Sequence, residues 1–139
     1  MKIRVLFLTV LLSLALCLPA MAEKKDFGKF KVLVPAGWTD TVDEETVILA
    51  APDNSAVITI SVAEHEGMSA TDIAKEMSKA LKGSTPERDA DGDYTFTYKN
   101  ENGAEGVGVV SVDGKNFVFI TLTGEHADVD KILESVEDK

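Results

Sequence analysis

The sequence is poor in cysteine and histidine, and each shortage removes a class of function. Its one cysteine, Cys17, lies in the apolar start of the chain, so the rest of the chain has neither a disulfide nor a thiolate nucleophile. P-loop and dinucleotide-binding glycine motifs are absent, and no serine stands in a Gly-x-Ser-x-Gly elbow. Thiol, nucleotide-dependent and serine-hydrolase chemistry therefore have no support in the sequence.

Positive charge is also scarce. The chain has 24 acidic and 14 basic residues, for a net charge of −10, and loss of Lys2 and Arg4 with the leader described below would lower this to −12. Such a surface repels phosphate backbones and anionic lipid headgroups, so we expect no nucleic-acid partner. A cationic partner and a divalent metal are both compatible with the charge, and so is a simple role in solubility.

The first 22 residues have the layout of a secretory signal peptide. A basic start, Met1 to Arg4, precedes an apolar stretch over residues 5–18 and a small-x-small cleavage site at Ala20-Met21-Ala22. The apolar stretch is shorter than the roughly 20 residues of a membrane span. The sequence therefore predicts a signal peptide over residues 1–22 and a single domain over 23–139. We expect a periplasmic or secreted protein without a transmembrane segment in the mature chain.

Cys17 leaves a lipoprotein as the alternative. A lipoprotein signal also ends its apolar stretch at a cysteine, and a lipid anchor would tether the protein to the membrane. Such signals carry a small residue directly before the cysteine, whereas this chain has Leu16. Conventional cleavage after Ala22 is therefore the favoured prediction.

Hydrophobic periodicity divides the mature chain into two halves of similar element order. Alternating or two-sided apolar runs predict strands, and apolar residues at helical spacing predict a helix in each half. The predicted strands cover residues 30–34, 46–51, 56–63, 94–98, 107–112 and 116–122, and the predicted helices 70–81 and 127–136. Ser69 is the expected N-cap of the first helix and Gly83 its C-terminal cap, while residues 40–45 and 84–93 are expected loops. The order βββα-βββα predicts an α+β fold, with an antiparallel six-stranded sheet and helices packed on its faces.

The start of the mature chain resembles a known family. Residues 27–38, FGKFKVLVPAGW, are similar to the F-x-(V/I)-x-(V/L)-P-x-G-W opening of the PsbP/Mog-like superfamily, and the Ala51-Pro52-Asp53 turn is similar too. Residues 132–136, ILESV, resemble the closing I-L-x-S-(V/L/I) of the same domains. The resemblance covers about residues 27–136, and its motifs are structural.

This resemblance implies an antiparallel sheet between helices, without a conserved active site. Members act by binding: they dock on photosystem II, bind the GTPase Ran, or are exported envelope proteins of the DcrB type. This chain matches no functional motif of the family, so the resemblance assigns a binding or catalytic role to none of its residues. The resemblance favours a non-enzymatic protein-binding or envelope accessory domain with an envelope protein as partner and no cofactor.

An acidic loop offers one candidate metal site. Asp89, Asp91 and Asp93 stand at alternate positions, as carboxylates do in calcium loops. The EF-hand pattern, however, needs a glycine and a glutamate where this chain has Tyr94 and Asn100. A solvated loop with an Asp-Gly turn is therefore favoured over weak calcium binding.

The two histidines offer a second candidate site. His65 and His126 each follow a predicted strand and precede a predicted helix, so we expect them at the same end of the sheet. With Glu64, Glu66 and Asp128 they would supply enough ligands for a tetrahedral metal. Two surface histidines are the favoured alternative, because nothing in the spacing demands a metal. An enzyme that uses either histidine as acid–base ranks last, behind a weak divalent-metal or small-ligand binding protein.

Aromatic residues are expected in structural roles. Trp38, which follows a Pro-x-Gly turn, is predicted to be a packing anchor rather than a ligand platform. Tyr94, Phe96 and Tyr98 share one face of a predicted strand, and we expect this face to pack beneath a helix rather than to bind an apolar ligand.

Overall fold

The structure is a computed structural model that describes residues 22–138. Residues 1–21 lie outside the described residues, and with them Cys17 and nearly all of the predicted signal peptide. In chain order the elements are β1 Glu23–Asp26, β2 Phe30–Val34, β3 Thr39–Asp43, β4 Thr46–Ala50, β5 Ala56–Glu64, α2 Ala70–Ala80, β6 Glu87–Arg88, β7 Tyr94–Lys99, β8 Glu105–Asp113, β9 Asn116–Gly124, α3 Val129–Ser135 and β10 Glu137–Asp138.

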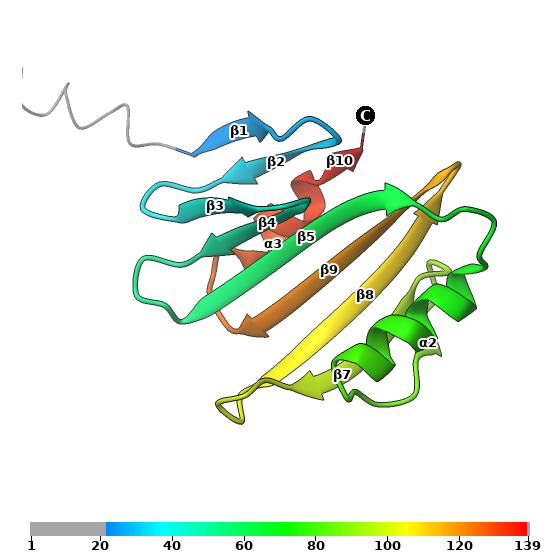
Figure 1. The fold of residues 1–139 in the computed structure, drawn as a ribbon. Helices are drawn as coiled ribbons and strands as arrows, with labels where there is room; N and C mark the ends of the chain where they lie inside the picture. Colours follow the sequence, from blue (N-terminus) through cyan, green and yellow to red (C-terminus); the bar gives the residue numbers. More distant parts are fainter. Residues whose placement is uncertain (1–21, 139) are drawn as a thin grey trace, which may run out of the picture.

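The strands form two antiparallel sheets (Figure 1). The main sheet has seven strands in the order β3-β4-β5-β9-β8-β7-β6, and the small sheet has three in the order β1-β2-β10. β5 and β9 pair from Ala56 opposite Gly124 to Glu64 opposite Asn116, and this pairing joins the two halves of the chain. The predicted α+β class is confirmed, but the prediction of a single six-stranded sheet is wrong. β2 leaves the main sheet for the small one, and β3 and β6 are added to the main sheet.

Among the strands that were not predicted from the sequence, β1 and β3 consist mainly of polar residues. β1 reads Glu-Lys-Lys-Asp and has no apolar side, yet it pairs with β2 along its whole length. β3 falls in the stretch expected to be an acidic loop. It is held by pairing with β4 through a two-residue turn, in which Glu44 adopts a φ of 55°. An edge strand tolerates charged side chains because one side of it faces solvent.

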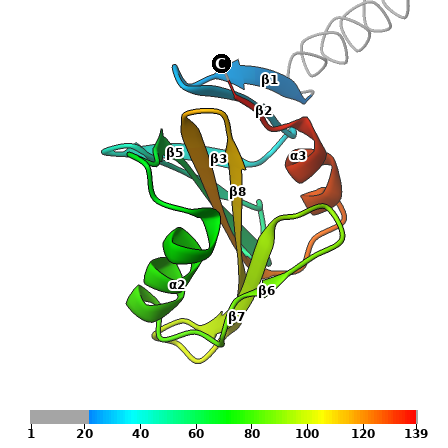
Figure 2. The same ribbon diagram turned by 90° about the vertical axis from the view of Figure 1, so that its right-hand side faces the viewer.

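The main sheet is covered on both faces, but each cover spans only part of the sheet. On one face, the α3 face, Leu49, Ile58 and Ile60 are fully buried beneath the small sheet and α3. On the opposite face, the α2 face, Ile73 and Val110 pack where α2 covers β7, β8 and β9. Figure 2 shows α2 and α3 on opposite sides of the sheet. Among the described residues, β7 and β8 therefore have no covering element on the α3 face.

α2 begins as predicted. The Ser69 hydroxyl accepts the backbone N–H of Asp72 at 3.1 Å, and this N-cap bond satisfies one of the free donors of the first turn. Ile73 and Ala74 are buried, and Met77 packs beside them. The apolar stripe expected from the sequence is thus the face that meets the sheet.

The C-terminus of α2 differs from the prediction. Lys82, with a φ of 55°, takes the left-handed position that was expected for Gly83. Gly83 instead donates its N–H to the Ser78 carbonyl at 2.8 Å. A Cβ on Gly83 would lie 2.7 Å from the Thr97 carbonyl oxygen and 2.9 Å from Phe96. The glycine therefore permits close packing of the helix end on β7 and does not supply the left-handed turn.

The aromatic face of β7 packs beneath α2, as predicted. Phe96 is 2% exposed, and Tyr94 lies in the cluster that α2 covers. Opposite Phe96 and Tyr98, strand β8 carries Gly108 and Gly106. A Cβ at either glycine would overlap the facing aromatic ring. The two glycines give the rings room to lie flat across the sheet.

α3 covers seven residues, fewer than the predicted range 127–136. Asp128 stands at its N-cap position but makes no capping bond, because its carboxylate accepts the indole N–H of Trp38. The Ser135 hydroxyl accepts the Leu33 N–H at 2.8 Å, which ties the helix to β2. Between residues 22 and 138, neither helix is long and apolar enough to span a bilayer.

The end of α2 supplies the first test. We expect Lys82→Gly to stabilise the domain by about 0.5–1 kcal/mol, because glycine adopts the left-handed conformation without Cβ strain. Gly83→Ala should destabilise it by about 1–3 kcal/mol through overlap with β7. Urea unfolding of the parent and both variants measures the two effects. A neutral Gly83→Ala together with a destabilising Lys82→Gly would contradict this assignment of roles.

Candidate functional site

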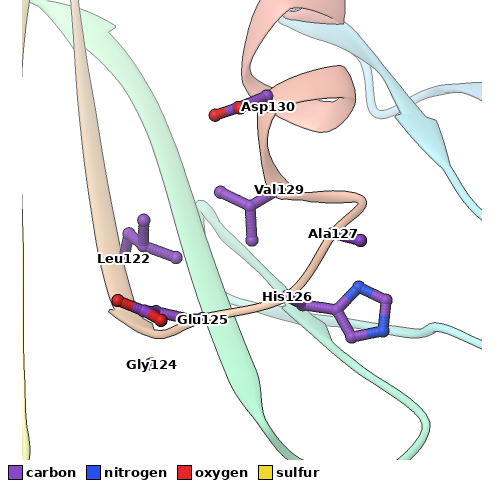
Figure 3. A pocket seen from close by; sticks show the side chains of 7 residues that line it. All are labelled: Leu122, Gly124, Glu125, His126, Ala127, Val129 and Asp130. Atoms are coloured by element: carbon purple, nitrogen blue, oxygen red, sulfur yellow. The ribbon is translucent and has the colours of Figure 1, made fainter.

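A groove of about 470 Å³ runs between the end of β9 and the start of α3. Leu122 from β9 and Val129 from α3 give it an apolar floor, and their side chains point into the space between the two elements (Figure 3). Glu125 and Asp130 place carboxylates on its rim. The groove therefore suits a group that combines an apolar part with a positive charge.

His126 belongs to the same connection, but its imidazole points away from the groove (Figure 3). It meets the ring of Trp38 edge to face, with centroids 5.2 Å apart. Its Nδ1 accepts the backbone N–H of Asp128 at 3.0 Å and lies 3.6 Å from a carboxylate oxygen of the same residue. The Asp128 carboxylate accepts the Trp38 indole N–H at 3.2 Å. Trp38 is only 6% exposed, which confirms its predicted role as a packing anchor.

The β4–β5 turn closes over this cluster. The Ser55 carbonyl accepts the Glu125 N–H at 3.0 Å. Gly124, with a φ of 83°, lies directly beneath that carbonyl, and a Cβ there would overlap it. Hydrogen bonds from Ser55, and to a smaller extent the nearby His126, hold the pKa of Asp53 below its ordinary value. Backbone bonds from Glu125 and side-chain bonds of His126 and Asp128 together fix the shape of the β9–α3 connection.

A second groove of about 440 Å³ lies on the same face of the sheet, beside β7. Thr95, Thr97 and Val107 line it, with Glu87 at its rim. Val107 is 39% exposed and pairs in register with Leu122 of the first groove. Cross-strand partners lie on the same face of a sheet, so the two grooves share one floor. We call this surface, formed by Thr95, Thr97, Val107, Val109 and Leu122, the open strip.

The open strip was not found from the sequence, although a strand over residues 107–112 was predicted. Val107 and Val109 fit the period-2 pattern of a half-buried strand, and the pattern predicts that their face meets a core. The small sheet and α3 cover this face over β4, β5 and β9 but leave β8 uncovered. Only the arrangement of the covering elements distinguishes the exposed valines from the buried ones.

His65 lies at the opposite end of the sheet from His126, so the prediction that they share one end is wrong. β5 and β9 are antiparallel neighbours, and the residue after β5 therefore lies beside the start of β9. The paired strands separate the two histidines by roughly 25 Å along the sheet. The His65 ring bonds the Gly114 carbonyl at 2.7 Å and accepts the Gly67 N–H at 3.0 Å. The two imidazoles form no joint site.

Asp89 is the first residue of a tight turn. Its Oδ1 accepts the backbone N–H groups of Asp91 and Asp93, both at 2.9 Å. Asn100 makes the same pair of bonds, to Asn102 at 3.0 Å and to Ala104 at 2.9 Å. In the next turn a neutral amide, that of Asn100, performs this role. Formation of the turn therefore explains why residue 89 has a side-chain oxygen, and no bound metal is needed to explain it.

No three His, Cys, Asp or Glu side chains converge on a metal-sized space between residues 22 and 138. Asp91 and Asp93 take part in the turn through their backbone N–H groups; Asp91 is exposed and Asp93 half-buried. Weak metal binding by this loop stays a prediction from the sequence.

Comparison with known proteins shows the fold. No protein-family model matches the chain, and no curated protein matches it in sequence. The structure is similar to the solution structure of cyanobacterial PsbP (CyanoP) from Synechocystis sp. PCC 6803, with a TM-score of 0.58 and 16% identity over 86% of this chain and 94% of that chain. A crystal structure from Bacteroides thetaiotaomicron VPI-5482 gives a TM-score of 0.52 and 15% identity over 86% of this chain and 48% of that chain.

The chain thus spans nearly all of the cyanobacterial protein and about half of the Bacteroides one. It has a PsbP-like α+β fold, as the resemblance of its opening residues predicted. At these identities the likeness describes the fold alone.

The acidic turn supplies the second test. We expect Asp89→Asn to change the free energy of unfolding by less than about 0.5 kcal/mol, and Asp89→Ala to lower it by about 1–2 kcal/mol, because only alanine removes both side-chain bonds. Urea unfolding with millimolar calcium and then with a chelator measures both variants and the parent. If calcium stabilises the parent and not Asp89→Asn, the carboxylate binds metal and the assignment to the turn alone is contradicted.

Proposed function

We propose that this chain is an exported, non-enzymatic binding module, whose open strip receives a basic surface of an envelope protein. The observation that carries the proposal is the uncovered half of the α3 face. Val107 is 39% exposed there, between two grooves that share its apolar floor. An apolar strip left open beside a covered core is typical of a protein interaction site.

Charge supports a basic partner. Glu125 and Asp130 border the open strip on the α3 side, and Glu87 borders it on the β6 side. The whole chain carries a net charge of −10. Positive groups on a partner would therefore be attracted from a distance and would meet carboxylates around an apolar centre.

The shape of the grooves favours a macromolecule over an enclosed small ligand. Both grooves are open to solvent, whereas sites for small molecules enclose most of the ligand surface. A partner that lies across the strip would cover Val107 and Val109 together. The area buried between this chain and its partner would then be spread over a broad contact instead of one deep pocket.

The arrangement of polar groups supports a non-enzymatic role. His65 and His126 each hold a loop through backbone hydrogen bonds, and roughly 25 Å separates them. The carboxylates of Glu125 and Asp130 face the groove from separate elements, without a hydrogen-bonded nucleophile beside them among the described contacts. General acid–base catalysis needs a positioned partner for each catalytic group.

Photocrosslinking tests the open strip. The predicted mature chain has no cysteine, so Val107→Cys introduces a single attachment point for a maleimide photocrosslinker. Val112→Cys is a matched control, because Val112 lies on the same strand with nearly equal exposure, 38% against 39%, but on the α2 face. We expect envelope extracts of the native host to give a discrete adduct with Val107→Cys and not with Val112→Cys. The adduct should weaken as salt is raised.

Equal adducts from both positions would contradict docking on the open strip. The non-enzymatic part has its own test in assays with ester, peptide and glycoside substrates. Reproducible turnover that one side-chain substitution abolishes would show that the chain is an enzyme.

The export part of the proposal rests on residues 1–22. β1 begins at Glu23, directly after the expected cleavage site, so removal of the leader takes no residue from the small sheet. We expect protein recovered from the native host to have the intact mass of a chain that starts at Glu23, and to lie in the periplasmic or culture fraction. A diacylglyceryl-modified chain that starts at Cys17, in the membrane fraction, would replace this expectation with an envelope lipoprotein.

A further inference from the structure

The main sheet ends at β3, and this edge presents backbone groups that the sheet does not use. The Ala51 N–H donates to the Ala56 carbonyl at 3.0 Å, so Ala51 and Ala56 are a hydrogen-bonded pair of the β4–β5 ladder. Hydrogen-bonded and non-hydrogen-bonded pairs alternate along an antiparallel ladder, and this one pair therefore assigns all the others. Alternate residues of β4 therefore face β3, and Thr39, Thr41 and Asp43 face β4 in return. The N–H and C=O groups of Asp40 and Val42 point away from the sheet. β3 is the last strand in the order, so no strand of the described chain pairs with them.

The other edge of the main sheet is closed. β6 pairs with β7 at Glu87 and Arg88. Further along β7, the Ser84 N–H donates to the Thr97 carbonyl at 2.8 Å, and the Ser84 hydroxyl accepts the Thr97 N–H at 3.0 Å. The outward backbone groups of Thr95 and Thr97 are thus paired within the chain, in contrast to those of β3.

An apolar groove opens beside the free edge. It has a volume of about 170 Å³ and lies between Val42 and Val47 of the sheet and Phe27 and Phe30 of the β1–β2 hairpin. Val42 is 59% exposed, more than any other large hydrophobic residue described. A strand added to β3 would place its residue opposite Val42 on the same face of the sheet, at the mouth of this groove.

The free edge is also acidic. Asp40 is held by Lys25 at 2.8 Å, and Glu45 lies 3.5 Å from Lys29. Asp43 and Glu44 have no ion pair among the described residues. The side chain of Asp43 lies on the α2 face of the sheet, opposite to the face of Val42. Asp40 lies on the face of Val42, and Glu44 and Glu45 line the groove beside the ammonium of Lys29. A strand that pairs here therefore meets carboxylates on both faces and an apolar floor on one.

We propose that β3 binds an extended segment of a partner protein by edge pairing, and that this segment carries an apolar residue flanked by lysine or arginine. The apolar residue enters the groove beside Val42. The basic residues on either side of it project onto the α2 face beside Asp43. The outward N–H and C=O groups of Asp40 and Val42 supply the main-chain bonds, as in other complexes formed by strand addition.

A second copy of this chain is a poorer occupant of the same edge. Antiparallel pairing of two β3 strands through Asp40 and Val42 centres on Thr41. It sets Asp40 of each copy directly opposite Val42 of the other, with Asp40 and Glu44 of that copy as its diagonal neighbours, so carboxylates of both copies gather along the shared edge. Acidic edge residues of this kind prevent edge-to-edge self-pairing, and they leave a basic strand as the matching partner.

This edge is distinct from the open strip, which lies over β7, β8 and the end of β9, on the other side of β4 and β5. The inference shares one premise with the proposed function, namely that the chain binds another protein. Loss of crosslinking at Val107 would leave the edge proposal standing, and the reverse holds as well.

Amide-resolved NMR tests the proposal with a defined probe. The ¹⁵N-labelled protein is titrated with the capped peptide Gly-Lys-Val-Lys-Val-Lys-Gly. Controls are the same peptide with Glu in place of Lys and a peptide of the same composition with its lysines grouped together. We expect the alternating basic peptide alone to shift the β3 amides. It should slow hydrogen exchange at Asp40 and Val42, whose N–H groups face outward, while Thr41 and Asp43 are protected already.

Two substitutions locate the binding. Val42→Pro removes an outward donor without breaking the β3–β4 ladder, and we expect it to weaken binding about fivefold or more. Val42→Lys should abolish binding, because it puts a positive charge at the groove. Val112→Lys is the control at another exposed valine, far from β3, and it should bind as the parent does.

Three results would overturn the proposal. One is the absence of binding by the alternating basic peptide in a protein whose spectrum shows it to be folded. A second is a set of shifts that lie outside β3 or that Val42→Lys leaves unchanged. The third is protection of the Asp40 and Val42 amides in the free protein, with a dimer in sedimentation, which would assign the edge to a second copy.

Discussion

The antiparallel pairing of β5 with β9 is the constraint on which the rest of the structure depends. These are nine-residue strands from different halves of the chain, and their register places Ile58, Ile60 and Ile120 on one face in a single layer. The same register sends the chain out of the sheet at opposite ends, toward α2 after β5 and toward α3 after β9. It therefore decides that His65 and His126 lie far apart, at opposite ends of the sheet.

The division of cover between the two faces follows from that pairing. α2 packs on β7, β8 and β9 because it leads from β5 into the second hairpin, where Tyr94 and Val110 meet its apolar stripe. α3 leads back toward the first half of the chain and is tied to β2 through Ser135. Each helix therefore packs over the strands that follow or precede it along the chain: α2 over β7, β8 and β9, and α3 over the first half. The open strip is the area on the α3 face that neither the small sheet nor α3 reaches.

The sequence predicted elements whose apolar pattern is strong, and it failed where backbone pairing decides the structure. The Ser69 cap, the stripe with Ile73 and the strand at Phe96 have local signals, because burial demands apolar side chains at the matching period. β1 and β3 have no such signal, since pairing with an existing strand holds a polar segment in place. The position of His126 relative to His65 depends on which strands are neighbours, and periodicity carries no information on that.

The open strip and the free edge of β3 also explain the use of negative charge in this chain. An uncovered apolar surface and an unpaired edge both promote self-association. Glu87, Glu125 and Asp130 border the first, and Asp43 and Glu44 the second. The carboxylates therefore make contact between two copies unfavourable at both surfaces. They favour a basic partner by the same interaction, because the charge that repels a second copy attracts a cationic surface.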